Sequence, residues 1–475
     1  MPSKKVFVVF LTAVFLFTFR NLQIPPGIET DEGVIAHNAA LISKTGRDQN
    51  GRFMPMFILS SDKMDWKQPV SIYLTAIYFK VFGMSLWVFK LVNVSVALIS
   101  LCLMWILLKT LFGEKEAVWG TIVLITTPMV VISTRIGTEA ISPLLFATAW
   151  LLTIALYRKN GRLVNLVLSA LTLGVGFYSY KGMRLVIPPW TLMTMGYIYH
   201  KSARDWGKFF RSVGVFTIVL FPFFSITPFL ELKYPGAVFE RATLALESYR
   251  HYAYYWLSNL DLGFLFLQGD VGRIFSVELF GSFLLGALPF FLVGIKKAVD
   301  KMSFFTFILG SYLLTPVLFG MAGSMGYGHR LVAIIPAYVI ITTLGIRGVR
   351  RGWNILLALF FAVNFFNFFT YYFYRYPQLH ETKTAFSNNL DRAYYRLATL
   401  SKKEQLAPYI QENVHQQHGE GNLFFEAAYF DNPLTLWKQG SPLPPKSILL
   451  TNMEVVDGLE KSNINASPLF IQKSR

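Results

Sequence analysis

The sequence predicts an all-α polytopic membrane protein that ends in a small α/β tail, and three observations lead to this fold class. Of its 475 residues, 53% are hydrophobic and 15% are charged, whereas about a quarter of a soluble domain is charged. Apolar runs recur that are long enough to cross about 30 Å of hydrocarbon. Short basic clusters separate these runs in a chain of net charge +17. A soluble enzyme is therefore excluded, and the single cysteine, Cys102, excludes an intrachain disulfide or a cysteine zinc cluster.

The apolar runs predict about eleven transmembrane helices. They are 5–23, 86–108, 117–134, 138–157, 163–180, 185–200, 209–229, 278–295, 303–322, 331–346 and 353–374. Basic clusters fall at every second gap, at Lys4 to Lys5, Lys109 to Lys115, Arg158 to Arg162, Lys201 to Arg211, Lys296 to Lys301 and Arg347 to Arg351. The positive-inside rule places these clusters in the cytoplasm, so the amino terminus lies inside and the tail lies outside.

The segment 69–83 decides on which side of the membrane every later loop lies. It is apolar but short, begins with a proline and contains Lys80, so we expect a helix at the outer membrane interface, not a span. The run 5–23 has the basic start of a signal peptide, but no small-x-small cleavage site follows it, and we expect an uncleaved anchor. The outer side then holds loop 24–85, loop 230–277 and the tail.

Charge and pattern predict a transmembrane domain over 1–376 and an extracytoplasmic C-terminal domain over 377–475. The tail holds ten basic and ten acidic residues, so the whole positive charge belongs to the membrane domain. Because those basic residues lie in short clusters between the apolar runs, where they set the membrane topology, they do not indicate nucleic-acid binding. Within the tail, 400–414 has helical spacing, and 422–430 and 447–456 resemble strands.

An acidic pair, Asp31 and Glu32, stands near the start of the first external loop. It opens a helix expected over 30–46, whose alanine and isoleucine residues share one face, with Thr30 or Asp31 as the N-cap. Acidic residues at such a position ordinarily cap the helix and complement its dipole. On helix physics alone, capping is the simpler interpretation of the pair.

Further polar side chains gather at the outer ends of the predicted spans. They are Arg135, Glu139, Tyr178, Tyr180, Lys181, Arg184, Asp270, His329 and Arg330. Each alone fits an interfacial anchor, because Tyr, Lys and Arg favour the level of the lipid headgroups. Together they bring several cations and carboxylates to one side of the membrane, as a site for a lipid phosphate and a proton acceptor requires.

The chemistry of such a site needs few groups. A lipid-phosphate leaving group departs as an anion and needs cations to hold it, and an attacking hydroxyl or amine needs a carboxylate as general base. One base and one anion cradle suffice for a single displacement at a sugar C1, which inverts that carbon. The sequence contains no Gly-rich phosphate loop of the P-loop or dinucleotide type, so no seat for a nucleotide donor is evident.

A series of short motifs follows the acidic pair through the loop. In order they are Asp31-Glu32, Thr45-Gly46, Pro55, Lys67-Gln68-Pro69, Tyr73 and Phe82-Gly83. This series resembles the first external loop of GT-C glycosyltransferases, in the branch of the protein O-mannosyltransferases and lipid A aminoarabinose transferases. Gln68 replaces the first proline of that branch's Lys-Pro-Pro. Arg135 with Glu139, Lys181-Gly182 and His329-Arg330 resemble later features, and the tail resembles nothing known to us.

The resemblance implies a membrane glycosyltransferase that moves a sugar from a polyprenyl-phosphate donor to an extracytoplasmic acceptor with inversion at C1. It makes Asp31 the catalytic base. We group Glu32 with Asp31 as a catalytic residue that supports the base or faces the acceptor, and solvation of its side chain is the alternative. We expect Lys67, Lys181, Arg184 and Arg330 to bind the donor phosphate. Supporting or acceptor-side roles fall to Arg135, Glu139, Tyr178, Tyr180, Asp270 and His329. The expected location is a bacterial plasma membrane, with the active site on the extracytoplasmic side.

The sequence establishes no cofactor and leaves a divalent metal open. In relatives an acidic residue can directly precede the lysine of Lys-Pro-Pro, but Trp66 holds that place here and Asp65 lies one residue earlier. The alternative function is a carrier or flippase for a lipid-linked sugar. A carrier needs polar residues through its span interiors, and spans 86–108 and 353–374 have almost none. A receptor that works through its tail is a third interpretation.

Overall fold

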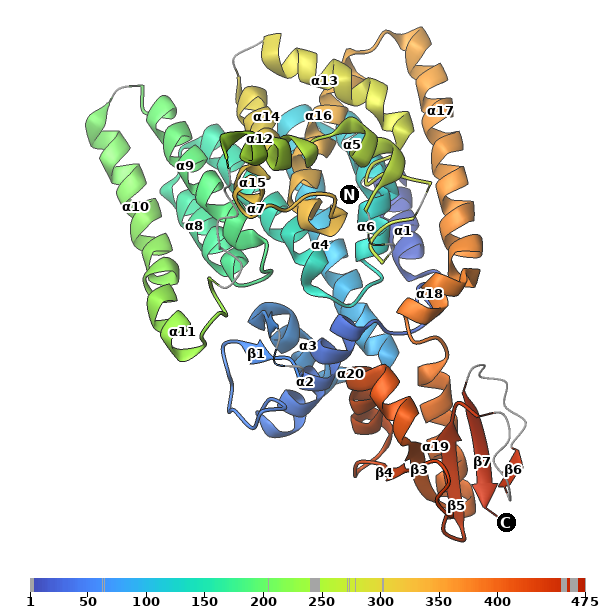
Figure 1. Cartoon of the computed structure of the whole chain (residues 1–475). Helices are drawn as coiled ribbons and strands as arrows, with labels where there is room; N and C mark the ends of the chain where they lie inside the picture. The colour runs from blue at the N-terminus through green and yellow to red at the C-terminus, as the bar shows by residue number, and fades with distance from the viewer. Residues whose placement is uncertain are drawn as a thin grey trace. The chain divides into compact units, whose positions relative to one another are not determined.

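The computed structural model describes the chain in two compact units. The described residues exclude 1–3, 62, 64, 204, 240–247, 271, 273, 278, 301–302, 454–458, 462–468 and 475. The first unit comprises Met1–Phe19, Asn93–Arg135 and Glu139–Phe373, and the second comprises Arg20–Val92, Ile136–Thr138 and Tyr374–Arg475. The first external loop (blue in Figure 1) and the tail (red), which the sequence analysis places in different domains, therefore share one unit.

The first unit is built from helices. They are α1 (Lys4–Thr18), most of α4 (Leu86–Phe112), α5 (Glu114–Thr126), α6 (Pro128–Ser133), η1 (Glu139–Ile141), α7 (Ser142–Asn160), α8 (Leu163–Phe177), α9 (Met183–Lys201), α10 (Trp206–Ser225), α11 (Thr227–Lys233), α12 (Tyr249–Ser258), η2 (Phe264–Gln268), η3 (Leu285–Ala287), α13 (Leu288–Asp300), α14 (Phe304–Leu314), α15 (Val317–Met321), η4 (Gly328–Ile334), α16 (Ile335–Gly348), α17 (Arg351–Thr370) and most of η5 (Tyr371–Arg375). Glycine lets two of them approach closely, because a Cβ on Gly345 of α16 would lie 1.7 Å from the Phe290 carbonyl oxygen of α13.

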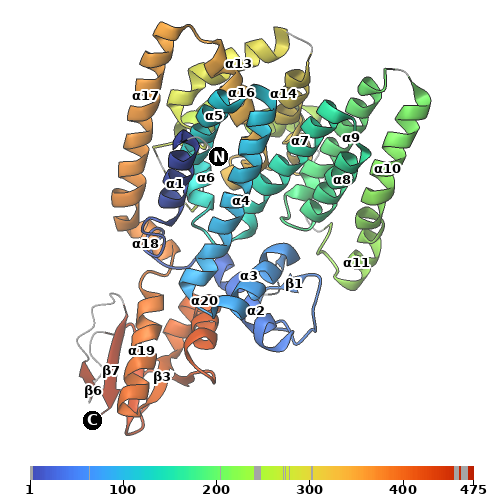
Figure 2. The same ribbon diagram turned by 180° about the vertical axis from the view of Figure 1, so that it is seen from behind.

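Six helical stretches of the described chain are long and apolar enough to cross a membrane. They are Leu86–Phe112, Glu139–Asn160, Trp206–Lys233, Phe304–Met321, Gly328–Gly348 and Gly352–Gln378. Each of the eleven expected spans overlaps one of these or a shorter helix, and the number of crossings stays a prediction. The helices α10 and α17 lie at opposite edges of this unit in both views (Figures 1 and 2) and are mostly exposed, as lipid-facing helices are. The predicted fold class, an all-α membrane protein with a small α/β tail, is confirmed.

The second unit combines short helices with two sheets. Its helices are α2 (Thr30–Thr45), α3 (Pro69–Phe82), the start of α4, η6 (Tyr376–Gln378), α18 (His380–Ala385), α19 (Leu390–Glu404) and α20 (Glu412–Tyr429). In the first loop, β1 (Ile58–Leu59) pairs antiparallel with β2 (Trp66–Lys67). The tail sheet has the order β4 (Thr435–Trp437), β3 (Ala407–Gln411), β5 (Ser447–Thr451), β7 (Phe470–Ser474) and β6 (Leu459–Lys461). In it β3 runs parallel to β4 and β5, and β7 runs antiparallel to β5 and β6.

One hydrophobic core joins the first loop to the tail inside this unit. Phe424 of α20 stacks on Phe79 of α3, with ring centroids 5.7 Å apart, and lies 6.0 Å from Phe89 of α4. A Cβ on Gly33 of α2 would lie 2.7 Å from the Gly421 nitrogen, so a glycine is required where α20 crosses α2. Burial of aromatic side chains is the main driving force for such packing, and the loop and the tail therefore stabilise each other.

Two expectations for the tail differ from the structure. The segment 422–430, expected as a strand for its aromatic residues, belongs to α20. Segment 400–414 holds the end of α19, the strand β3 and the start of α20. The segment 447–456 begins with β5 as expected, and its residues 454–456 lie outside the described part of the chain. Strand propensity reflects packing on a half-buried surface, and here tertiary packing against α2 and α3 overrides it.

Candidate functional site

The motifs of the first loop correspond to helix boundaries. Pro69 is the first residue of α3, where a missing N–H costs no hydrogen bond. Gly46 ends α2 with a φ of 71°, a left-handed conformation that favours glycine. Gly83 ends α3 with a φ of 83°. The Tyr73 hydroxyl donates to the Pro55 carbonyl at 2.8 Å, so these two motif residues tie the loop to α3.

Helix α2 begins with a capping box formed by Glu29 and Glu32. The Glu29 carboxylate accepts a hydrogen bond from the Asp31 N–H at 2.8 Å, and the Glu32 carboxylate accepts one from the Glu29 N–H at 2.9 Å. The N-cap is thus Glu29, and not Thr30 or Asp31 as the sequence suggested. Capping therefore does not account for the Asp31 side chain, which is 57% exposed.

Asp31 pairs with Lys67, the first residue of the Lys-Gln-Pro motif. The Lys67 Nζ donates to Asp31 Oδ1 at 2.6 Å and to Asp65 Oδ2 at 2.9 Å. The Lys67 side chain is only 4% exposed, and its position at the end of β2 is fixed by the β1–β2 hairpin. The Ser60 N–H donates to the Asp65 carbonyl at 2.9 Å and closes the hairpin turn. The structure thus brings together the predicted base and the predicted phosphate ligand.

Asp31 and Lys67 line a pocket of about 310 Å³ within the second unit. Thr30, Ser60 and Asp65 also line it, together with residues of the tail helix α20. The lining therefore offers hydroxyl groups, carboxylates and one ammonium group. A pocket with a few convergent polar groups is the usual form of a small-molecule site.

The first turn of α2 concentrates negative charge beside this pocket. Burial, together with the nearby charges of Asp31 and Glu32, raises the pKa of Glu29 from 4.5 to about 8. Two like charges within a few ångströms cannot both ionise at their ordinary pKa. Glu29 therefore carries a proton over much of the neutral range.

Glu32 lies in a fully buried ion pair and is not among the residues that line the pocket. Its Oε1 accepts from the Lys90 Nζ and from the Gly137 N–H, both at 2.5 Å, and neither ionic side chain has exposed area. These contacts hold the start of α2 to α4. The sequence analysis did not select Lys90, although a lysine inside an apolar run is a sign of function or pairing.

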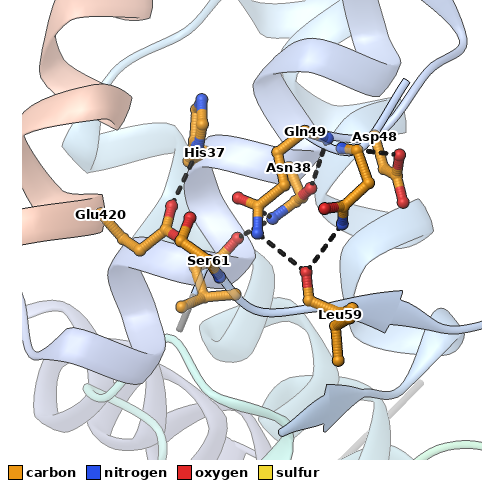
Figure 3. A network of polar contacts seen from close by, with 9 residues as sticks. His37, Asn38, Asp48, Gln49, Leu59, Ser61 and Glu420 are labelled. Atoms are coloured by element: carbon orange, nitrogen blue, oxygen red, sulfur yellow. Dashed lines mark hydrogen bonds and ion pairs between the residues drawn. The ribbon is translucent and has the colours of Figure 1, made fainter. Parts of the chain in front are cut away.

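A second buried network links α2 to the tail (Figure 3). The His37 Nδ1 lies 2.9 Å from Glu420 Oε2, and Glu420 Oε1 accepts from the Ser61 N–H at 3.1 Å and from the Ser61 hydroxyl. Burial raises the pKa of Glu420, but the hydrogen bonds from His37 and Ser61 outweigh it and hold that pKa below its ordinary value. His37 is thus a buried partner of Glu420.

Polar side chains beside this network hold the loop that leads into the β1–β2 hairpin. The Asn38 Nδ2 donates to Gln49 Oε1 at 3.1 Å, and the Gln49 N–H donates back to Asn38 Oδ1 at 3.0 Å. The Gln49 Nε2 then donates to the Leu59 carbonyl at 2.8 Å, as Figure 3 shows. The position of Lys67 is therefore set by α2 through side-chain amides.

In the first unit, Asp270 ties together the segments that hold Gly272 and Gly328. Its carboxylate accepts from the Gly328 N–H and from the Gly272 N–H, both at 2.8 Å, and lies 3.4 Å from the His329 Nδ1. The His329 ring lies against Phe275, with centroids 4.5 Å apart. Asp270 and His329, predicted separately, are thus neighbours.

The remaining predicted residues of this unit contact residues that were not predicted as part of the site. The Arg184 Nη1 donates to the carbonyls of Ala237 and Val238, and Arg330 donates to the Ser324 hydroxyl. Arg135 donates to the Leu16 carbonyl and lies over the Phe373 ring, and Arg330 lies over the Tyr327 ring. The Tyr178 hydroxyl donates to the Phe223 carbonyl, and the Glu139 backbone carbonyl accepts from the Ser142 hydroxyl. Tyr180 and Lys181 are partly exposed between α8 and α9.

The side chains around Lys67 do not form a metal site in the described part of the chain. Among the described residues, no group of three His, Cys, Asp or Glu side chains is placed to share a metal ion. Trp66 stands directly before Lys67, and the carboxylates of Asp31 and Asp65 both pair with the Lys67 ammonium group. The carboxylates around Lys67 are thus arranged about an ammonium group.

Comparison with known proteins gives a family match and matches to solved structures. Residues 67–229 match the family described as dolichyl-phosphate-mannose-protein mannosyltransferase. The fold is similar to that of ArnT from Cupriavidus metallidurans, at 13% identity. The TM-score is 0.56 for the apo crystal structure, over 98% of this chain and 97% of that one, and 0.57 for the structure bound to undecaprenyl phosphate, over 99% and 98%. No curated protein sequence gives a significant match. The family match and the ArnT-like fold confirm the resemblance to the protein O-mannosyltransferase and lipid A aminoarabinose transferase branch of the GT-C glycosyltransferases.

Proposed function

We propose that this chain is a membrane glycosyltransferase that moves a sugar from a polyprenyl-phosphate donor to an extracytoplasmic acceptor, with inversion at C1. The observation that carries the proposal is the pairing of Asp31 with Lys67 at the edge of a polar pocket. The family match over residues 67–229 and a fold relative solved with undecaprenyl phosphate support the donor class.

The reaction assigns each of the two groups one task. Asp31 takes the proton of the acceptor hydroxyl or amine, the acceptor atom bonds to the sugar C1, and the bond from C1 to the phosphate oxygen breaks. The electron pair leaves with the polyprenyl phosphate, whose charge Lys67 holds. A single displacement needs no nucleophilic carboxylate and therefore inverts C1.

The ion pair must open during this cycle. Lys67 is buried and paired with two carboxylates, whereas Asp31 is 57% exposed and can turn toward the pocket. A donor phosphate then replaces Asp31 as a partner of the Lys67 ammonium group, and Asp65 keeps that group in place. Lys181, Arg184 and Arg330 stay predictions as further phosphate ligands, as do the acceptor-side roles of Glu139, Asp270 and His329.

The test is transfer from radiolabelled polyprenyl-phosphate sugars by purified protein, with a membrane extract as the acceptor source. Asp31→Asn keeps the size of the side chain but cannot take a proton, and we expect the transfer rate to fall by about 10²–10⁴-fold. The matched control is Asp205→Asn, which changes the N-cap of α10 to another good N-cap residue. Unchanged transfer by Asp31→Asn would refute the proposed base, and donor that crosses vesicles without losing its sugar would favour a carrier.

A further inference from the structure

The tail helix α20 forms part of the pocket that holds Asp31. Gln416, Gly419 and Glu420 of this helix line the pocket together with Asp31 and Lys67. The pocket thus draws its two sides from segments almost 400 residues apart in the chain. The two segments belong to one unit and share its hydrophobic core, so their relation is set by packing.

Two sets of contacts fix helix α20 against helix α2, which carries Asp31. The close crossing at Gly33 brings the backbone of α20 onto α2, two residues after Asp31. Glu420 then bonds to His37 of α2 and to Ser61 of the hairpin turn, the same turn that carries Asp65 and leads to Lys67. A buried carboxylate held by several donors is rigid and costly to displace.

A break at Gly419 divides α20, and residues on both sides of the break line the pocket. Gly419 has a φ of 42° and a ψ of −118°, a backbone conformation that side-chain-bearing residues rarely adopt, and it divides the helix into two segments. Gln416 lies in the first segment, is exposed and lines the pocket, whereas Gln417 is exposed and does not line the pocket. The Gln416 amide is both a donor and an acceptor and suits a hydroxyl-bearing partner.

We infer that α20 is the acceptor-side wall of the active site, with Gln416 contacting the acceptor and Glu420 positioning the wall; this rests on the proposed transferase function. The acidic and basic residues of the lining are Asp31, Asp65 and Glu420, with Lys67 and His415. Because carboxylates outnumber the ammonium group there, the wall takes a hydroxyl- or amine-bearing group without negative charge. Glu420 is 7% exposed and acts through Ser61 and His37, so it is a positioning residue.

The test compares two substitutions that differ by one position on the same helix, Gln416→Leu and Gln417→Leu. With the solubilised membrane extract as acceptor probe, we expect Gln416→Leu to raise the half-saturating amount of extract about three- to tenfold, as for one lost hydrogen bond. The half-saturating concentration of the labelled donor should stay unchanged. Gln417→Leu should match the wild type in both measurements.

Three results would overturn the inference. Equal behaviour of the two variants would remove Gln416 from the acceptor, and a raised donor half-saturation in Gln416→Leu would place α20 on the donor side. If Glu420→Gln changes the melting temperature without changing the acceptor half-saturation, the positioning role fails. The proposed function fails separately, if Asp31→Asn transfers sugar as well as the wild type.

Discussion

The buried pair of Glu32 and Lys90 offers a stringent test of how the first turn of α2 is held. The substitution is Lys90→Met, which keeps an unbranched apolar side chain of similar length and removes the charge. The pair is 2.5 Å long with both side chains fully buried. After the substitution the Glu32 carboxylate stays buried, with the N–H groups of Glu29 and Gly137 as its remaining partners.

The expected size of the effect follows from this geometry. Two unit charges 2.5 Å apart attract by roughly 7 kcal/mol at an effective dielectric constant of about 20. The loss of two hydration shells offsets most of that gain, whereas removing one partner alone typically costs about 3–5 kcal/mol. Two N–H groups still solvate Glu32, so we expect the low end, about 3 kcal/mol. The double variant Glu32→Gln with Lys90→Met buries no charge and should recover most of the loss.

The assay is the melting temperature of the purified protein in detergent, followed by tryptophan fluorescence. At about 2–4 °C per kcal/mol for a folding unit of this size, Lys90→Met should melt about 6–12 °C below the wild type. Lys109→Met is the control, because its pair with Glu114 is exposed and 3.5 Å long and should contribute little. The reasoning is refuted if Lys90→Met melts like the control, or if the double variant melts as low as Lys90→Met.

Two further predictions use the same unit. In the folded state the pKa of Glu29 is raised to about 8, so protonation of Glu29 stabilises the fold at low pH. This stabilisation is lost as pH rises from about 4.5 toward 8. The melting temperature of the wild type should therefore fall over that range, and that of Glu29→Gln should fall less steeply. Gly33→Ala places a Cβ 2.7 Å from the Gly421 nitrogen and should cost about 1–3 kcal/mol by overpacking, whereas Gly214→Ala, with nothing within 4 Å, should melt no lower than the wild type. A flat pH profile in the wild type, or equal melting of the two alanine variants, would contradict these expectations.

The parts of this structure that were predictable from sequence depend on local pattern. The apolar runs gave the helices of the first unit, since length and composition alone determine whether a helix can span hydrocarbon. Helix α2 and the interfacial segment, now α3, were also found within a residue or two. Asp31 and Lys67 are 36 positions apart, and only the resemblance of the loop to a known family indicated that both belong to one site. Their direct pairing was not predicted.

What could not be predicted depends on contacts distant in the chain. Nothing in the sequence around Glu420 indicates that it meets His37, 383 positions away. Helix α20 was expected as a strand at 422–430, because its aromatic residues have strand propensity until Phe79 and Phe89 are known to cover them. Lys90 was overlooked inside an apolar run for the same reason, since its buried partner belongs to another helix.

The shared core of the first loop and the tail also decides which experiment can distinguish an enzyme from a receptor that works through its tail. Deleting 377–475 would remove Phe424 from Phe79 and Glu420 from His37, and would leave α2 and α3 without their cover. Loss of function after that deletion is therefore expected in both cases, because Asp31 would no longer be held beside the pocket. A point substitution separates them: Asp31→Asn keeps the core intact, and it abolishes a transferase while it leaves a receptor working.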